Sequence, residues 1–169
     1  MEVEGDDHCC MGKGLTMEEI SIKQGALLQP ARFHRALLAQ LNISERLNVA
    51  CAMLLLRLEF EDLYAEHYDI GQPEALRGTF AQMVSGMVRK TDTVGWLEEG
   101  CLAVILRAVT AEETTLVATR LQKQLARTPV LVGQHNLYMA VQVGGVWTSG
   151  DNPMPVDVFT EQAYFAMIS

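Results

Sequence analysis

Two short apolar segments, residues 93–97 and 101–106, are separated by only three residues, and this spacing constrains the fold more than any other feature of the chain. The connecting residues are Glu98, Glu99 and Gly100. A short connection that contains glycine, placed between two runs of strand-forming residues, is typical of a β-hairpin, because glycine adopts the backbone angles that tight turns need. The sequence therefore predicts a β-hairpin in the middle of the chain.

Segments with helical and strand patterns lie on both sides of this hairpin. The predicted helices cover residues 30–41, 61–68, 74–88, 111–126 and 156–167, and the other predicted strands cover residues 49–58 and 137–146. Apolar residues recur at helical spacing in several of these segments, and in 111–126 much of the apolar face is expected from Leu116, Leu121 and Leu125. The alternation of helices and strands predicts an α/β sandwich in which helices flank a mixed sheet.

The charge of the chain limits the kinds of ligand that it can hold. The chain has 169 residues with 13 basic and 21 acidic side chains, so that its net charge is -8. Such a chain has no general attraction for nucleic acid, and local arginines must hold any anionic ligand against the overall field. This favours a small nucleotide over a nucleic-acid polymer.

The length fits one domain, which we expect to span residues 16–169 after a disordered tail at residues 1–15. The run 49–56 is too short to cross a bilayer, and the acidic start of the chain does not resemble a signal peptide, so we expect a cytoplasmic protein without membrane insertion. His8, Cys9 and Cys10 lie in the predicted tail. They have no second ligand cluster at a usable spacing, and we predict no metal site there.

From about Ile22 to the end, the chain resembles the GGDEF domain of bacterial diguanylate cyclases. The family opening, D-x-L-T-G-L-x-N-R-x-x-F, corresponds to residues 22–33, where Leu27 and Phe33 keep the packing positions. The family asparagine, which contacts substrate, is replaced by Gln29. The resemblance implies the GGDEF fold, with packing positions kept and polar positions changed.

The two later motifs of the family show the same pattern. The signature turn, in which two glycines precede two acids and a phenylalanine, corresponds here to Glu98, Glu99, Gly100, Cys101 and Leu102. The closing helix of the family, A-D-x-A-L-Y-x-A-K, is similar to residues 160–168, where Ile168 replaces the lysine. The hairpin turn is therefore interpreted as a degenerate signature.

Cyclase chemistry in the family needs Mg²⁺ ions held by carboxylates beside a triphosphate, and this chain replaces the residues in question. Where the resemblance places a D-x-D-like element, the chain reads Leu56-Arg57-Leu58-Glu59, so that an arginine or leucine stands for the first acid. The signature contributes Cys101, a soft ligand that is mismatched to Mg²⁺. We predict no catalysis, no metal and no cofactor.

A rearranged metal site is the alternative to this loss of metal binding. It would use three acids, Glu59 and the two turn glutamates Glu98 and Glu99. We favour solvated turn glutamates instead, whose side chains and charges would oppose the approach of phosphates.

Many cyclases of this family also have an inhibitory R-x-x-D site, five residues before the signature, that binds cyclic di-GMP as an intercalated dimer. Arg89 and Asp92 have this pattern, and five residues separate Asp92 from Glu98. An arginine can donate two hydrogen bonds to guanine O6 and N7, while a carboxylate accepts from the N1 and N2 donors of the same base. A second family arginine corresponds to Arg120. The predicted ligand site is therefore Arg89, Asp92 and Arg120.

The resemblance predicts a cyclic di-GMP receptor that controls a protein partner or further domains of a larger regulator, such as an exopolysaccharide or cellulose secretion or attachment system, with a ligand-mediated dimer as one form of docking. Three alternatives stay open. Arg89 and Asp92 would form only a surface ion pair in an interaction scaffold that binds no nucleotide. The domain would alternatively be a residual enzyme or bind GTP. Trp96 would either pack as a core residue or cover a base.

Overall fold

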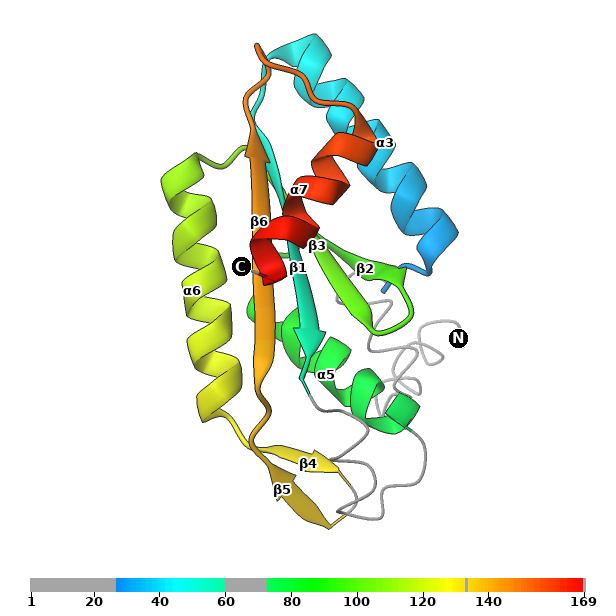
Figure 1. The fold of residues 1–169 in the computed structure, drawn as a ribbon, viewed down its shortest axis with the longest axis vertical. Helices are drawn as coiled ribbons and strands as arrows, with labels where there is room; N and C mark the ends of the chain where they lie inside the picture. Colours follow the sequence, from blue (N-terminus) through cyan, green and yellow to red (C-terminus); the bar gives the residue numbers. More distant parts are fainter. Residues whose placement is uncertain (1–26, 60–72, 133, 169) are drawn as a thin grey trace, which may run out of the picture.

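The structure is a computed structural model that describes residues 27–59, 73–132 and 134–168. The predicted tail, the tail residues His8 to Cys10 and the predicted helix 61–68 lie outside these ranges. The described helices are α3 (Pro30–Leu47), α5 (Pro73–Met87), α6 (Ala111–Arg127) and α7 (Val156–Ile168), and the described strands are β1 (Cys51–Leu58), β2 (Thr93–Glu98), β3 (Cys101–Arg107), β4 (Val130–Val132), β5 (His135–Leu137) and β6 (Val141–Thr148) (Figure 1).

The main sheet has four strands in the order β2-β3-β1-β6. All three of its strand pairs are antiparallel, so the expected mixed sheet is wrong for the described strands. The parallel contact in the described chain is an isolated bridge from Leu28 to Gly95, which joins the segment before α3 to the edge strand β2. The expected β-hairpin is confirmed as β2 and β3, and Gly100 has the positive φ of 82° that its turn requires.

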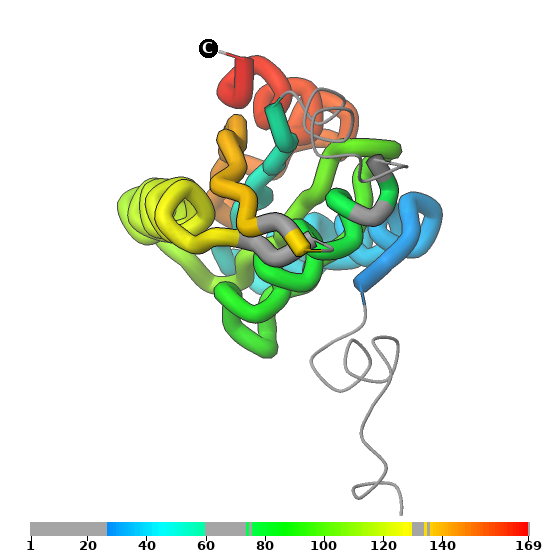
Figure 2. Tube along the Cα trace, turned by 90° about the horizontal axis from the view of Figure 1, so that it is seen from below, coloured from blue at the N-terminus to red at the C-terminus, as the bar shows by residue number. Residues whose placement is uncertain are grey.

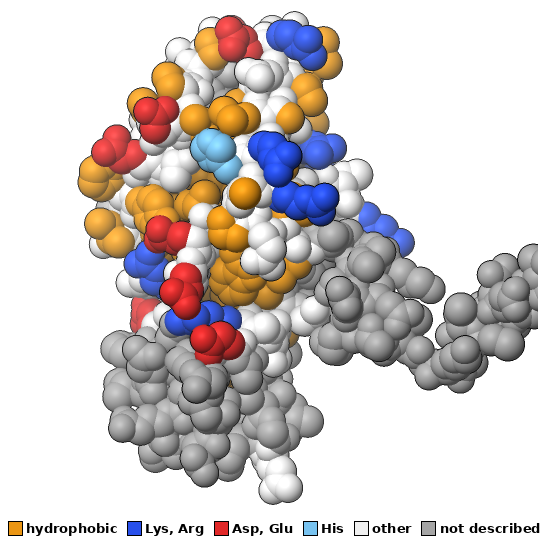
Figure 3. All heavy atoms as spheres, turned by 90° about the vertical axis from the view of Figure 1, so that its right-hand side faces the viewer, with side chains coloured by type: hydrophobic (Ala, Val, Ile, Leu, Met, Phe, Trp, Pro, Cys, Tyr) orange, Lys and Arg blue, Asp and Glu red, His pale blue; other side chains and the backbone are white. Residues whose placement is uncertain are grey.

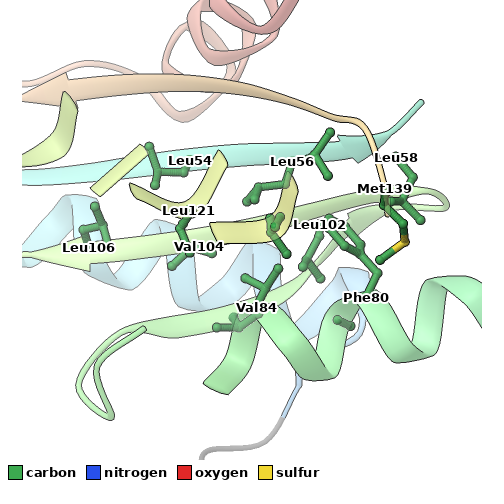
Figure 4. Close-up of a cluster of buried hydrophobic side chains, with 14 of the residues drawn as sticks. Leu54, Leu56, Leu58, Phe80, Val84, Leu102, Val104, Leu106, Leu121 and Met139 are labelled. Atoms are coloured by element: carbon green, nitrogen blue, oxygen red, sulfur yellow. The ribbon is translucent and has the colours of Figure 1, made fainter. Parts of the chain in front are cut away.

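Strand β1 lies in the middle of the core because its alternate residues enter two different hydrophobic clusters. One cluster, between the sheet and α5 and α6, contains Leu54 and Leu56 together with Phe80 from α5 (Figure 4). The other, between the sheet and α3 and α7, contains Met53 and Leu55. Figure 2 shows the helices around the strands. Burial on both faces explains why β1 is apolar at all of its buried positions rather than alternating.

Helix α6 differs from its predicted apolar face. Leu121 and Leu125 are fully buried, as expected, but Leu116 is 68% exposed and the buried residue of the first turns is Thr114. Residues 114, 121 and 125 are separated by seven and four positions, which places them on one side of a helix, and position 116 lies about 200° around the axis from 114. The expectation for Leu116 was therefore wrong.

The predicted strand 137–146 is in fact two segments. Its first residue ends β5, which pairs with β4 in a separate two-stranded sheet, and β6 begins only at Val141. Leu137 and Met139 are both buried in the cluster beside α5 and α6. Because they are two positions apart, the sequence shows the alternation of apolar residues that is typical of a single strand. Among the helices of the described ranges, none combines the length and the apolar character needed to cross a membrane.

Candidate functional site

Arg89 and Asp92 lie in the turn that joins α5 to β2, just beyond the last helical residue, Met87. The backbone N–H of Asp92 donates to the carbonyl of Arg89 at 3.0 Å, and the backbone N–H of Arg89 donates to Oδ2 of Asp92 at 2.9 Å. The two residues thus hold one compact turn by local side-chain and backbone bonds, as aspartate commonly does.

Their side chains also contact each other directly. Nε of Arg89 donates to Oδ2 of Asp92 at 3.4 Å, and Nη2 donates to Oδ1 at 3.2 Å. The Asp92 side chain is only 3% exposed, whereas that of Arg89 is 57% exposed. Arg89 is therefore oriented and accessible, while the Asp92 carboxylate is covered and already accepts three hydrogen bonds. This is the mutually paired geometry expected of a structural pair, and it leaves little of Asp92 for the edge of a base.

A hollow of about 310 Å³ adjoins this pair. Arg89, Lys90, Asp92 and Arg107 contribute its charged lining, and we refer to it as the Arg89 hollow. Nη2 of Arg89 also donates to the backbone carbonyl of Arg107 at 3.3 Å, so the guanidinium is bound from two sides. Sequence reasoning missed Arg107, because only the pairing of β3 brings this residue, 18 positions further along, beside Arg89.

Arg120 does not line the Arg89 hollow. It is exposed on α6, and its Nη2 donates to the carbonyl of Met87 at 3.3 Å. A cation is favourable at this position because the last carbonyls of a helix carry partial negative charge. The structure thus places Arg120 near the start of the turn, at the end of α5, but not with Arg89 and Asp92 in one hollow.

The turn that the sequence interpretation treats as a degenerate signature, Glu98 to Gly100, lies at the opposite end of the β2–β3 hairpin. Oε2 of Glu98 lies 3.8 Å from Nη2 of Arg57, and Oε2 of Glu99 accepts from Nη1 of Arg77 at 3.2 Å. Both glutamate side chains are exposed, as expected for solvated residues, but each also faces an arginine. Sequence reasoning missed both ion pairs, which join the turn to β1 and α5.

Trp96 and Gln29 belong to this end of the hairpin. Together with Arg77, Glu99 and Gly100 they line a second hollow of about 450 Å³. Trp96 is partly buried and packs against the cluster beside α5 and α6, so its expected packing role is confirmed. It does not line the Arg89 hollow.

Cys101 and Leu102, the last two signature residues, are fully buried core residues. Burial raises the pKa of the Cys101 thiol, and hydrogen bonding with Tyr164 of α7 offsets part of this rise. Desolvation, together with hydrogen bonding to Glu98, raises the pKa of Tyr164. The guanidinium carbon of Arg57 lies 6.0 Å from the centre of the Tyr164 ring. Cys101 is therefore a protonated packing residue beside an arginine.

These residues do not fit a magnesium ion. Magnesium takes hard oxygen ligands, whereas β1 carries Arg57 next to its last residue and the hairpin contributes a buried thiol at Cys101. Glu98 and Glu99 face arginines, and the described ranges contain no group of three or more Asp, Glu, His or Cys side chains arranged to hold a metal.

An apolar groove of about 430 Å³ lies between α3, β2 and α7. Its lining includes Leu97, Tyr164, Phe165 and Ile168, and the last two side chains are 58% and 64% exposed. Figure 3 shows hydrophobic side chains gathered on this side of the molecule, next to acidic and basic side chains that alternate.

Comparison with known structures finds the same fold in solved GGDEF domains. The FimX GGDEF domain from Pseudomonas aeruginosa is 13% identical and has a TM-score of 0.74, with 86% of this chain and 89% of that chain covered. The GGDEF domain of DgcB from Caulobacter crescentus, solved in complex with c-di-GMP, is 9% identical with a TM-score of 0.74, and 86% and 85% are covered. The chain has the GGDEF fold.

A third neighbour is the diguanylate cyclase SiaD from Pseudomonas aeruginosa, solved in complex with its activator SiaC. It is 15% identical with a TM-score of 0.75, and the GGDEF-fold chain described here, aligned over 97% of its length, covers 64% of SiaD. No protein-family model matches the sequence. No curated protein matches it either. At these identities the likeness is one of fold, and the function of this GGDEF-fold chain must be argued from its own residues.

Proposed function

We propose that this chain is a GGDEF-fold domain without cyclase activity that binds cyclic di-GMP through Arg89 and thereby regulates a protein partner. The observation on which the proposal rests is the state of Arg89, whose guanidinium is more than half exposed yet fixed by Asp92 and by the carbonyl of Arg107. Nε and Nη2 are engaged by these partners, so Nη1 supplies the N–H groups that would donate to the O6 and N7 acceptors of guanine, and the fixed position limits the loss of side-chain entropy. A structural neighbour that holds the same ligand adds support.

The loss of cyclase activity is proposed from the hairpin turn. A nucleotide triphosphate would meet Glu98 and Glu99 in place of glycines, and by the resemblance Arg57 or a neighbouring leucine stands where a metal-binding acid is needed. Incubation with GTP and either Mg²⁺ or Mn²⁺ should give no cyclic di-GMP and no other guanine nucleotide product. Formation of product would contradict this part of the proposal.

Isothermal titration calorimetry tests the binding itself. We expect wild-type protein to bind cyclic di-GMP with a Kd of about 1 μM or tighter. Arg89→Ala should abolish binding, because it removes the exposed guanine-reading group. Arg127→Ala, which removes an exposed arginine at the end of α6, is the matched control and should bind like wild type. Absence of heat for wild-type protein that circular dichroism shows to be folded would refute the proposal.

The second candidate is an interaction scaffold that binds no nucleotide. The covered state of Asp92 favours it, because a carboxylate that is 3% exposed and bonded to its own arginine is what a purely structural turn requires. The exposed side chains of Phe165 and Ile168 are also suited to protein contact. For both candidates, the partner would be further domains of a larger regulator or a separate protein, such as a component of an exopolysaccharide, cellulose or attachment system. A dimer linked by cyclic di-GMP belongs to the first candidate, the receptor, alone.

A further inference from the structure

The Arg89 hollow has an excess of positive charge in a chain whose net charge is -8. Its lining contains Arg89, Lys90 and Arg107 but only one carboxylate, that of Asp92. Asp92 is engaged by Arg89. Among the described residues, neither Lys90 nor Arg107 forms an ion pair. Two cations beside the Arg89–Asp92 pair are thus left for an anion that comes from outside the chain.

The backbone holds Arg107 close to Arg89. Arg107 is the last residue of β3, and its carbonyl accepts from Nη2 of Arg89 at 3.3 Å. The chain then turns sharply at Ala108, which has a positive φ of 54° and donates its N–H to the carbonyl of Ala50 at 2.9 Å. A non-glycine residue in this conformation persists only where its surroundings fix it. The backbone of Arg107 is therefore held beside the Arg89 guanidinium by the fold.

Arg107 lines the hollow and its side chain is exposed, so its positive charge adds to that of Arg89 and Lys90 and favours an anion at this place. A phosphate is well matched, because arginine forms paired hydrogen bonds with its oxygens. From this we infer that Arg107 is a second ligand-binding arginine of the Arg89 hollow and that it contacts a phosphodiester of a cyclic dinucleotide. The inference deepens the proposed function and rests on it.

This assignment gives different roles to the other charged residues. Asp92 is a positioning residue that acts through Arg89, since its carboxylate is covered. Arg120 secures the end of α5 through the Met87 carbonyl and lies outside the lining of the hollow. Removal of Arg107 should therefore weaken ligand binding more than removal of Arg120, whereas the sequence alone suggested Arg120 as the second arginine.

The test compares Arg107→Ala, Arg120→Ala and the control Arg127→Ala by calorimetry with two probes, cyclic di-GMP and cyclic di-AMP, at two salt concentrations. We expect Arg107→Ala to raise the Kd about tenfold or more for whichever dinucleotide binds, with a smaller loss for Arg120→Ala and none for the control. The salt dependence of binding should also become less steep in Arg107→Ala, since one phosphate contact is lost. Circular dichroism melts verify that each variant is folded.

The outcomes separate this inference from the proposed function. If cyclic di-AMP binds in an Arg107-dependent manner and cyclic di-GMP does not bind, the phosphate-binding role of Arg107 stands and the proposed function is wrong. If cyclic di-GMP binds and the Kd of Arg107→Ala stays within about twofold of wild type, the inference is wrong and the proposed function stands. If neither dinucleotide binds the folded wild-type protein, both are refuted.

Discussion

Replacement of Gly144 by alanine is expected to destabilise the domain strongly, because α7 lies directly on strand β6 at this residue. A Cβ at position 144 would lie 2.3 Å from the backbone nitrogen of Met167, 2.5 Å from its Cα and 2.6 Å from the carbonyl oxygen of Ala163. All three are backbone atoms of the helix, so no side-chain rotation can relieve the contact. The helix itself must move away from the sheet.

The size of the effect follows from these distances. Ordinary contacts begin near 3.4 Å, so α7 must move outward by about 1 Å, which weakens the packing of its buried residues Phe159, Ala163 and Met167 together. Overpacking of a core costs about 1–3 kcal/mol. Because a whole helix is displaced, we expect a loss of about 3 kcal/mol in the free energy of unfolding, which for a chain of this length corresponds to a fall in Tm of roughly 6–12 °C.

Urea denaturation followed by far-UV circular dichroism measures this loss. The matched control is Gly78→Ala in α5, where an added Cβ meets no atom within 4 Å. The same substitution should there raise stability by roughly 0.5–1 kcal/mol, because alanine is the better helix former. A Gly144→Ala variant that lies within about 1 kcal/mol of wild type, or a control that is destabilised equally, would show that α7 does not pack on β6 as described.

Three further predictions concern local interactions. Thr110→Ala should lower the free energy of unfolding by about 1 kcal/mol in a urea series, because Oγ1 of Thr110 accepts from the N–H of Glu113 at 3.0 Å at the start of α6, and Thr110→Ser should retain most of the stability. The free energy of unfolding should fall as pH rises above about 9, because burial raises the pKa of the Cys51 and Cys101 thiols, so that the unfolded chain loses its thiol protons at a lower pH than the folded chain. A series of denaturation curves with the same free energy of unfolding from about pH 8 to 10 would argue against this. Trp147→Phe should cost about 1 kcal/mol or more, because it leaves the carbonyl of Val109 without the indole N–H that donates to it at 2.7 Å, and thermal melts measure the change.

The parts of the fold that depend on local pattern were predictable from the sequence. The β2–β3 hairpin has a short turn with glycine, and β1 is apolar at every buried position, so both could be located without knowledge of their neighbours. The split between β5 and β6 was not predictable in this way. Leu137 and Met139 are buried outside the main sheet, and a pattern of alternate burial does not distinguish a strand from an extended segment that packs on a helix.

The candidate site shows the same division. Arg89 and Asp92 are three residues apart, so their proximity follows from any turn at this position. Arg107 and the arginine partners of the turn glutamates lie far away in the sequence, and only the pairing of β1, β3 and α5 brings them close. The burial of Asp92 was also hidden from the sequence, because it depends on how Arg89 covers the carboxylate.

The pairing of Arg57 with Glu98 also restricts the order in which this sequence can change over generations. An acid introduced at position 57 while Glu98 is present would replace the attraction between Arg57 and Glu98, whose charged atoms lie 3.8 Å apart, with a repulsion between two carboxylates. Glycine at position 98 would first remove one of them. A lineage that gains an acid at position 57 would therefore lose Glu98 first, and mutational libraries that vary both positions should recover the acid at 57 mainly where position 98 is no longer acidic.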